Sequence, residues 1–173
     1  IIDNDYEAHA QEHSIEVQLP FLQFPGRDFR LVPIVLALQD WNTVKDVAQA
    51  IASAVRDVDR DVVVIASSDF THAGFMYRDS PPEGYSPGEY AKKKDKAALE
   101  MIKKYDPGGL IRVVDENRIT MCGPGCVAAM LVATRELGAE KVEFLGYATS
   151  QDVKKERHAD LAVGYGAFAV YRQ

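Results

Sequence analysis

The sequence predicts an α/β fold in which a mixed, mostly parallel sheet is flanked by helices. Within the predicted strand 61–66, residues 62–66 form a continuous apolar run rich in β-branched side chains, which is typical of a strand buried on both faces. This run lies between two helical patterns, 42–58 and 86–105, and such alternation favours parallel pairing through right-handed crossovers. Two more strand-like runs, 141–148 and 163–171, follow towards the C-terminus and complete the predicted sheet.

The N-terminal third supplies three elements. Residues 12–22 carry apolar side chains at helical spacing with Pro20 among them, which predicts a short, irregular helix. Residues 31–36 predict a strand, and Pro33 within it favours an edge position. Residues 42–58 place their apolar side chains on one helical face. These side chains are Val44, Val47, Ala48, Ile51, Ala54, Val55 and Val58.

The remaining segments predict a loop and three helices. Residues 76–87 are rich in Pro, Gly and Ser, which indicates a long loop that would lie beside the candidate site as a lid. The helix predicted for 86–105 carries a lysine cluster that we interpret as its solvated face: Lys92, Lys93, Lys94 and Lys96. A short helix is expected over 106–114 after the cap Asp106, and a helix that is apolar nearly all round over 126–137.

Composition excludes several classes of protein. The 173 residues fit one domain, and their net charge of −6 gives no electrostatic footprint for nucleic acid. No apolar run is long enough to predict a membrane span, and no basic amphipathic helix indicates a membrane surface. Two cysteines in a chain of this length do not make a disulfide framework. We therefore expect a cytoplasmic protein.

Asp69 and His72 follow the predicted buried strand 61–66. Ligands collect beyond the carboxyl ends of such strands in open α/β sheets. A carboxylate and an imidazole three residues apart can converge, so that Asp69 orients His72 for general acid–base work. The structural alternative is that Ser67, Ser68 and Asp69 cap the next element and that His72 is an ordinary loop residue.

Cys122 directly precedes the predicted buried helix and is followed by a Gly-Pro-Gly run. The unpaired N–H groups at a helix N-terminus favour a thiolate, which suits metal ligation or nucleophilic attack. Cys126, one turn further on, is interpreted as a small core residue. The pair lacks the second knuckle that a structural zinc site requires. A purely structural Cys122 and a disulfide between the two cysteines stay open as alternatives.

A second cluster near the N-terminus contains Glu12, His13 and Glu16. The two carboxylates are one helical turn apart, and His13 is the candidate functional residue among them. Ordinary surface solvation is the structural alternative for the carboxylates. His9 and His158 lie in charged, irregular surroundings and are assigned no role.

Three motifs in this order give the chain a specific resemblance. They are Glu12-His13-Ser14-Ile15-Glu16 continuing to Leu19-Pro20, Ser67-Ser68-Asp69-Phe70-Thr71-His72-Ala73-Gly74, and Cys122-Gly123 before an apolar helix. Together they resemble the Memo family, whose members are named for a mediator of growth-factor-driven cell motility in animals. The resemblance covers essentially the whole of residues 1–173 as a single Memo-like domain.

The resemblance implies a fold related to class III extradiol dioxygenases of the LigB type, which are non-haem iron enzymes. It implies a metal held by two histidines of an N-terminal segment and by a cysteine that corresponds to Cys122. Asp69 and His72 would line the same cleft, and His13 would lie where relatives place another polar residue. Neither metal histidine matches this sequence, since His9 corresponds to neither. We therefore expect that the N-terminal segment is missing here.

Three functions are compatible with this pattern. The first is iron or copper binding in the intact protein, with redox or oxygen chemistry in which His72 moves a proton and Asp69 orients it. The second is a binding protein that holds a small molecule or peptide without turnover, with Phe70, Phe75 and Tyr77 as aromatic neighbours of the cleft. The third is an enzyme with Cys122 as its nucleophile and His72 as base. Whether the protein is catalytic stays open at this point.

Overall fold

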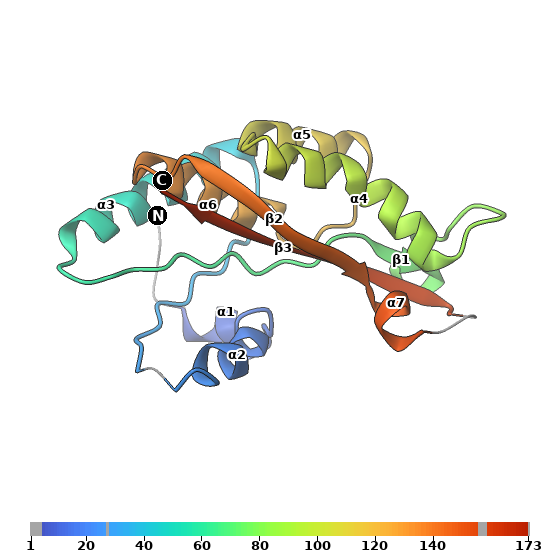
Figure 1. Ribbon diagram of the computed structural model, residues 1–173, viewed down its shortest axis with the longest axis horizontal. Helices are drawn as coiled ribbons and strands as arrows, with labels where there is room; N and C mark the ends of the chain where they lie inside the picture. Colours follow the sequence, from blue (N-terminus) through green and yellow to red (C-terminus); the bar gives the residue numbers. More distant parts are fainter. Residues whose placement is uncertain (1–4, 27, 156–158, 173) are drawn as a thin grey trace.

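The structure is a computed structural model that describes residues 5–26, 28–155 and 159–172. Its sheet has three strands in the order β1 (His72–Gly74), β3 (Leu161–Tyr171) and β2 (Lys141–Thr149). Both pairings are antiparallel: His72 lies opposite Val163, and β2 runs beside β3 along nearly its full length. In Figure 1 the long strands β2 and β3 run side by side through the middle of the molecule as a two-stranded ribbon.

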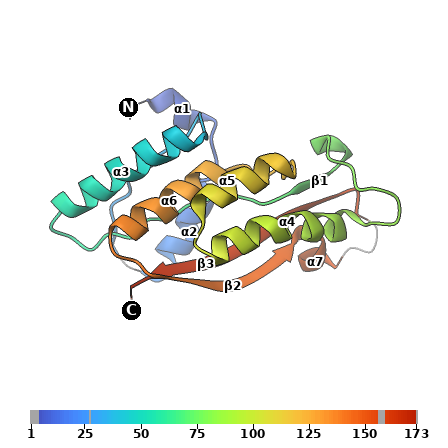
Figure 2. The ribbon, with the colours of Figure 1, turned by 90° about the horizontal axis from the view of Figure 1, so that it is seen from above.

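Four long helices form a layer beside this ribbon, as Figures 1 and 2 show together. They are α3 (Trp41–Asp57), α4 (Pro87–Lys103), α5 (Pro107–Glu116) and α6 (Pro124–Glu136). Helix α4 packs on β2 and β3, α5 packs on α4 and α6, and α3 packs on the outer side of α6. Their facing side chains and Met121, from the loop before α6, make one apolar core. The helical side chains in it include Val44, Ala48, Ala52, Ile102, Leu110, Val127 and Leu131.

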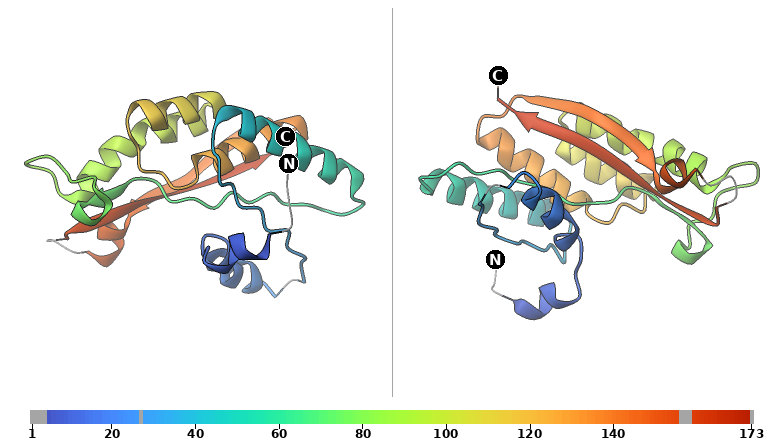
Figure 3. Two further views of the ribbon diagram at one scale, coloured as in Figure 1. Left: turned by 180° about the vertical axis from the view of Figure 1, so that it is seen from behind. Right: turned by 60° about the horizontal axis from the view of Figure 1, so that its bottom comes forward.

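The N-terminal segment lies on the opposite side of the extended segment 58–71 from this helical layer, as the left view of Figure 3 shows. It contains α1 (Tyr6–Ala10), the 3-10 turn η1 (Glu16–Gln18) and α2 (Leu19–Gln23), none of which has a buried residue. Two more short elements complete the chain. They are the 3-10 turn η2 (Phe75–Tyr77), directly after β1, and α7 (Ser150–Lys154), directly after β2.

The mixed α/β class and the long helices are as the sequence predicts, but the sheet differs. Its described strands pair antiparallel, so the expectation of a mostly parallel sheet was wrong. The predicted helix over 12–22 is split into a turn, η1 and α2. The predicted strands 31–36 and 61–66 are extended, yet they belong to no described strand. Periodicity found these apolar runs, but a strand also requires a neighbour with which to pair.

Residues 61–66 form no strand because, in the part of the chain that the structure describes, they have no neighbouring segment with which to pair. The same segment joins β3 only later, where the Phe70 N–H donates to the Gly164 carbonyl at 2.9 Å. Upstream of that point the segment and β3 diverge around a groove of about 580 Å³ with an apolar lining. Val63 is 83% exposed and Ile65 51%. Among the described residues, no backbone hydrogen bond pairs 61–66 with a neighbouring segment.

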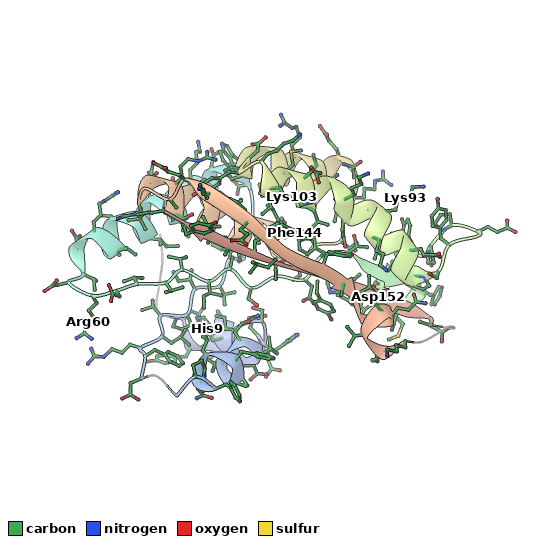
Figure 4. The ribbon with its side chains drawn as sticks, viewed as in Figure 1. His9, Arg60, Lys93, Lys103, Phe144 and Asp152 are labelled. Carbon is green, nitrogen blue, oxygen red and sulfur yellow. The ribbon has the colours of Figure 1, made fainter. Side chains whose placement is uncertain are left out.

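The lysine cluster on α4 is only partly the solvated face that the sequence predicts. Lys92 and Lys93 are exposed, and Lys93, labelled beside α4 in Figure 4, donates to the Tyr85 hydroxyl at the surface. Lys94 differs, because only 11% of its side chain is accessible and its Nζ lies 2.6 Å from Asp79 Oδ2. Spacing alone placed Lys94 with its neighbours, whereas the segment after β1 folds back and covers it.

Candidate functional site

The loop that follows the extended segment 61–66 docks onto the N-terminus of α6. The backbone N–H of Asp69 donates to Cys122 Sγ at 3.1 Å, and Ser68 Oγ lies 3.6 Å from the same sulfur. In turn, the Gly123 N–H donates to Ser68 Oγ at 2.9 Å. The Cys122 side chain stays exposed although these two segments hold it in place. An exposed, oriented sulfur at a helix N-terminus is well placed to act as a ligand or a nucleophile.

Gly123 permits this close approach. A Cβ atom at residue 123 would lie 3.1 Å from Ser68 Cβ and 3.2 Å from the Ser67 carbonyl oxygen. Both distances are tighter than ordinary van der Waals contact, and one of the two neighbours is backbone. Any larger residue would therefore push the loop away from the thiol.

Asp69 also faces His72. Its Oδ2 lies 3.4 Å from His72 Nε2, with 41% of the Asp69 side chain and 20% of the His72 side chain accessible. The backbone and the carboxylate of Asp69 thus contact two different groups, the thiol and the imidazole. The structure therefore brings together three of the four residues that the sequence singles out: Asp69, His72 and Cys122.

The opposite side of the His72 ring is fixed by Thr120 and Tyr77. His72 Nδ1 lies 2.8 Å from the Thr120 carbonyl oxygen. The Thr120 carbonyl and the Asp69 carboxylate both accept, and the contact at Nδ1 is the shorter one, 2.8 Å against 3.4 Å, so we assign the proton of the neutral ring to Nδ1 and leave Nε2 facing Asp69. The Tyr77 ring packs edge-on against the imidazole, with 5.1 Å between the ring centroids. These contacts select one ring orientation.

The environment of His72 raises its pKa above the ordinary value of 6.5. The main cause is the interaction with the Asp69 side chain, which stabilises the imidazolium form. Partial burial of the ring acts in the opposite sense, and the Thr120 carbonyl adds to the increase. Because Asp69 raises this pKa, the ring holds its proton more readily than an unperturbed histidine does, which suits a group that takes up and releases a proton.

His13 lies in a segment that is tethered to the same loop, but in the described part of the chain no hydrogen bond or ion pair links its ring to Asp69, His72 or Cys122. Ser67 Oγ donates to the Ser14 carbonyl at 2.7 Å, and Gln18 Nε2 donates to Ser67 Oγ at 2.9 Å. The His13 side chain itself is exposed. The role predicted for His13 stays a prediction.

The Glu12 carboxylate, next to His13, accepts local hydrogen bonds from Ser14. The Ser14 hydroxyl and N–H both donate to Glu12, and this lowers the pKa of the Glu12 carboxyl. Figure 4 places His9 on the N-terminal helical segment, on the other side of the sheet ribbon from the long helices. No role was expected for His9, and none follows from this position.

Sequence reasoning missed two residues of the site and misplaced a third. Thr120 contacts His72 from a loop with no recognisable motif, so no local signal could reveal it. Tyr165 has its pKa raised by burial and then by the nearby charges of Asp69, Tyr77 and Cys122. The alternation of Gly164, Tyr165 and Gly166 on β3 was a usable signal for an outward tyrosine.

Of the three aromatic residues expected beside the cleft, Phe70 was placed wrongly. It is only 3% exposed and packs edge-on against Tyr147 in the core, with ring centroids 6.1 Å apart. Phe75 and Tyr77 are exposed, at 87% and 40%. The aromatic surface near His72 therefore comes from η2 and not from the segment before it.

The described residues supply part of a metal site but not a whole one. Cys122 offers one accessible soft donor. In residues 5–26, 28–155 and 159–172, no group of three or more His, Cys, Asp or Glu side chains is arranged to hold a metal ion. Cys126 is half-buried, and burial raises the pKa of its thiol; both cysteines are free. A metal at Cys122 would need further ligands from elsewhere.

No helix in the described part of the chain is long and apolar enough to cross a membrane. The sequence matches a family model described as "Memo-like protein" over residues 1–169. It is 43% identical over 173 residues to a MEMO1 family protein of Methanopyrus kandleri, an alignment that covers 99% of this chain and 56% of that protein.

Other archaeal relatives give the same picture. A MEMO1 family protein of Methanothermobacter thermautotrophicus is 43% identical over 165 residues, covering 95% of this chain and 54% of the relative. One of Pyrococcus abyssi is 40% identical over 178 residues, covering 99% and 60%. The chain thus spans little more than half the length of these relatives. Because both the family model and the relatives match nearly all of this sequence, the chain belongs to the Memo-like protein family.

Proposed function

We propose that this chain carries one wall of a metal-binding site, with Cys122 as a thiolate ligand and with Asp69 and His72 as a proton-transferring pair beside it. The supporting observation is the double contact of Asp69. Its N–H donates to Cys122 Sγ at 3.1 Å, and its carboxylate lies 3.4 Å from His72 Nε2. A soft donor and an acid–base group are thereby held next to each other, with the sulfur accessible.

The proposed metal is iron or copper. A thiolate combined with imidazole suits these ions better than magnesium or calcium, which prefer oxygen ligands. The other ligands would come from the part of the full-length protein that this chain does not span, since its relatives are nearly twice as long. Among the described residues only Cys122 is assigned as a ligand.

The bound metal would supply activation of dioxygen or of a bound substrate, which makes a metal-dependent oxidoreductase the proposed class of enzyme. The protein's own residues would handle the proton. His72 would accept it at Nε2 and return it from there, while the carbonyl of Thr120 keeps Nδ1 protonated. Asp69 would orient the ring and stabilise its cationic form. The exposed Phe75 and Tyr77 would provide apolar contact for a small molecule or peptide near the ring.

Metal analysis of the full-length protein tests this proposal. We expect near-stoichiometric iron or copper in the wild-type protein, a severalfold loss in the Cys122→Ser variant, and no loss in the matched Cys126→Ser variant. Cys126 is the appropriate control because it lies in the first turn of α6, four residues after Cys122, with a half-buried thiol. Equal metal content in all three proteins would rule out Cys122 as a ligand.

Two further measurements, ligand binding and thiol alkylation, separate the alternatives. A wild-type protein that holds no metal and binds a peptide or small ligand without turnover would favour a binding protein. Alkylation of Cys122 that is fast at neutral pH and is suppressed by His72→Ala would instead favour a cysteine nucleophile.

A further inference from the structure

A largely buried ion pair, Lys94 with Asp79, lies on the Thr120 side of His72 and has no part in the proton transfer proposed above. Lys94 Nζ is 2.6 Å from Asp79 Oδ2, and the accessible fractions of the two side chains are 11% and 12%. The same ammonium donates to the Arg118 carbonyl at 2.5 Å, and Tyr90 donates its hydroxyl to Asp79 Oδ1 at 2.9 Å. The pair therefore has a fixed geometry, unlike an exposed salt bridge between two mobile side chains.

Thr120 connects this pair to His72. Its hydroxyl accepts the His72 backbone N–H at 2.8 Å and lies 3.2 Å from Asp79 Oδ2. Its carbonyl oxygen lies 2.8 Å from His72 Nδ1. One residue thus holds both the backbone and the ring of His72, while Asp79 holds the hydroxyl of that residue.

The hydrogen-bonding capacity of these groups determines which of them donates and which accepts. A threonine hydroxyl has one proton to donate and can accept through its lone pairs. The Thr120 hydroxyl lies 3.2 Å from both the His72 carbonyl oxygen and Asp79 Oδ2, and we assign its proton to Asp79 because a carboxylate is the stronger acceptor. This leaves a lone pair of Thr120 Oγ1 for the His72 N–H, while Lys94 donates to the same Asp79 oxygen. The chain of contacts runs from Lys94 through Asp79 and Thr120 to His72.

The fold brings Asp79 to this position by a tight reversal after β1. Gly74 and Asp79 form an antiparallel bridge, in which the Gly74 N–H donates to the Asp79 carbonyl at 2.9 Å. Gly74 has φ 139°, and a Cβ there would lie 2.7 Å from the Asp160 carbonyl oxygen, so glycine is required. The same reversal carries Tyr77, which packs on the His72 ring.

We propose that Thr120 is a positioning residue for His72, and that the Asp79–Lys94 pair fixes the orientation of Thr120 so that the imidazole keeps Nδ1 protonated and presents Nε2 to Asp69. The proposal rests on the proton-transfer role given to His72 above. It adds three residues that make no hydrogen bond or ion pair with Cys122 or Asp69 in the described structure, and it assigns a role to the one lysine of the α4 cluster that is withdrawn from solvent.

Nitrogen-15 NMR of the His72 ring in the full-length protein tests this proposal, recorded at alkaline pH, where the ring is neutral, and assigned with a His72→Gln variant. We expect one tautomer, with the proton on Nδ1, in the wild-type protein and in Thr120→Ser, which keeps the hydroxyl. Thr120→Val and Lys94→Met should lose that single signature and give averaged nitrogen shifts. Lys92→Met is the matched control, because its ion pair with Asp152 is exposed and on the same helix.

Two results would overturn the proposal. One is an unchanged tautomer in Thr120→Val, and the other is an equal effect of Lys94→Met and Lys92→Met. If Thr120→Val fails to fold, the Lys94 and Lys92 pair still decides. The tautomer of the His72 ring is measured without any metal ion. A failure of the proposed metal site would appear in the metal content and would leave the ring signature intact, so the two failures are distinguishable.

Discussion

The backbone N–H of Asp69 and the sulfur of Cys122 are 53 residues apart in the sequence and 3.1 Å apart in the structure. This contact joins the loop after the extended segment 61–66 to the N-terminus of α6. Because the Asp69 carboxylate also faces His72, a shift of this loop would move the imidazole and the thiol relative to each other. The geometry of the candidate site therefore depends on how closely the loop and α6 approach.

That approach depends on Gly123. Replacing it with valine should destabilise the protein by about 1–3 kcal/mol, because the new side chain overlaps Ser68 and the Ser67 carbonyl. Urea unfolding measures the loss. Gly146→Val is the matched control, since a Cβ at residue 146 meets nothing within 4 Å, and it should change stability by about 0.5 kcal/mol or less. Equal effects of the two substitutions would contradict the close contact.

The Asp69→Asn substitution should lower the pKa of His72, since the Asp69 side chain is the main cause of its elevation. An NMR titration of the ring protons measures the change. Asp46→Asn, an exposed carboxylate on α3, serves as the control and should leave the titration of His72 where it is. A His72 titration that is identical in Asp69→Asn and wild type would show that the two side chains do not interact in solution.

The same pair has a consequence for stability against pH. The folded pKa of His72 is raised, so the folded state binds this proton more tightly than the unfolded chain does. The resulting stabilisation is fully present below pH 6.5, the ordinary value, and is lost as the pH rises through the folded pKa. In urea unfolding over this range, the stability difference between wild type and Asp69→Asn should shrink as pH rises. A difference that grows with pH would contradict the assignment.

Substitution of Asp95 on α4 should lower the stability of the protein far more than substitution of an exposed carboxylate. It is fully buried, and it accepts hydrogen bonds from the Thr71 N–H at 3.0 Å, the Thr71 hydroxyl at 2.5 Å and the Tyr147 hydroxyl at 2.6 Å. Asp95→Ala should cost about 3 kcal/mol or more, because it leaves three buried donors unpaired. Tyr147→Phe, which removes one donor, should cost about 1–2 kcal/mol. Thermal unfolding compares them, and a milder effect for Asp95→Ala would be inconsistent with this network.

Amide hydrogen exchange should distinguish the two halves of the segment that leads to His72. Residues 62–66 have no backbone partner among the described residues, whereas Ala73 pairs with Ala162 on β3. We therefore expect rapid exchange over 62–66 and protection over 72–74 in this chain. Protection across 62–66 equal to that of β3 would mean that the apolar groove beside them is occupied in solution.

The helices were predictable because each buries one apolar face, and that pattern is local. The helices expected over 42–58 and 86–105 appear as α3 and α4 within two residues at each end. The sheet was less predictable, because pairing depends on segments distant in the sequence. The run 61–66 has the composition of a buried strand, but its orientation and partners are not encoded in its own residues.

The residues of the candidate site also fall into two groups, those with a local sequence signal and those that depend on contacts between distant segments. Asp69, His72 and Cys122 were found from residue chemistry next to element boundaries, which is a local signal. Thr120 and Asp79 contribute through a backbone carbonyl and through a contact with another element, so neither carries a motif. Lys94 was misread because its burial arises from the reversal after β1 and not from its position on α4.

The most direct test of the account is the absorption spectrum of the full-length protein loaded with Co²⁺ in place of its proposed metal. Thiolate coordination gives an intense sulfur-to-cobalt charge-transfer band, which oxygen and nitrogen ligands do not give. We predict this band in the wild-type and Cys126→Ser proteins and its absence in Cys122→Ser. A band that survives in Cys122→Ser, or one that is absent from a wild-type protein shown to hold stoichiometric cobalt, would contradict the assignment of Cys122 as a metal ligand.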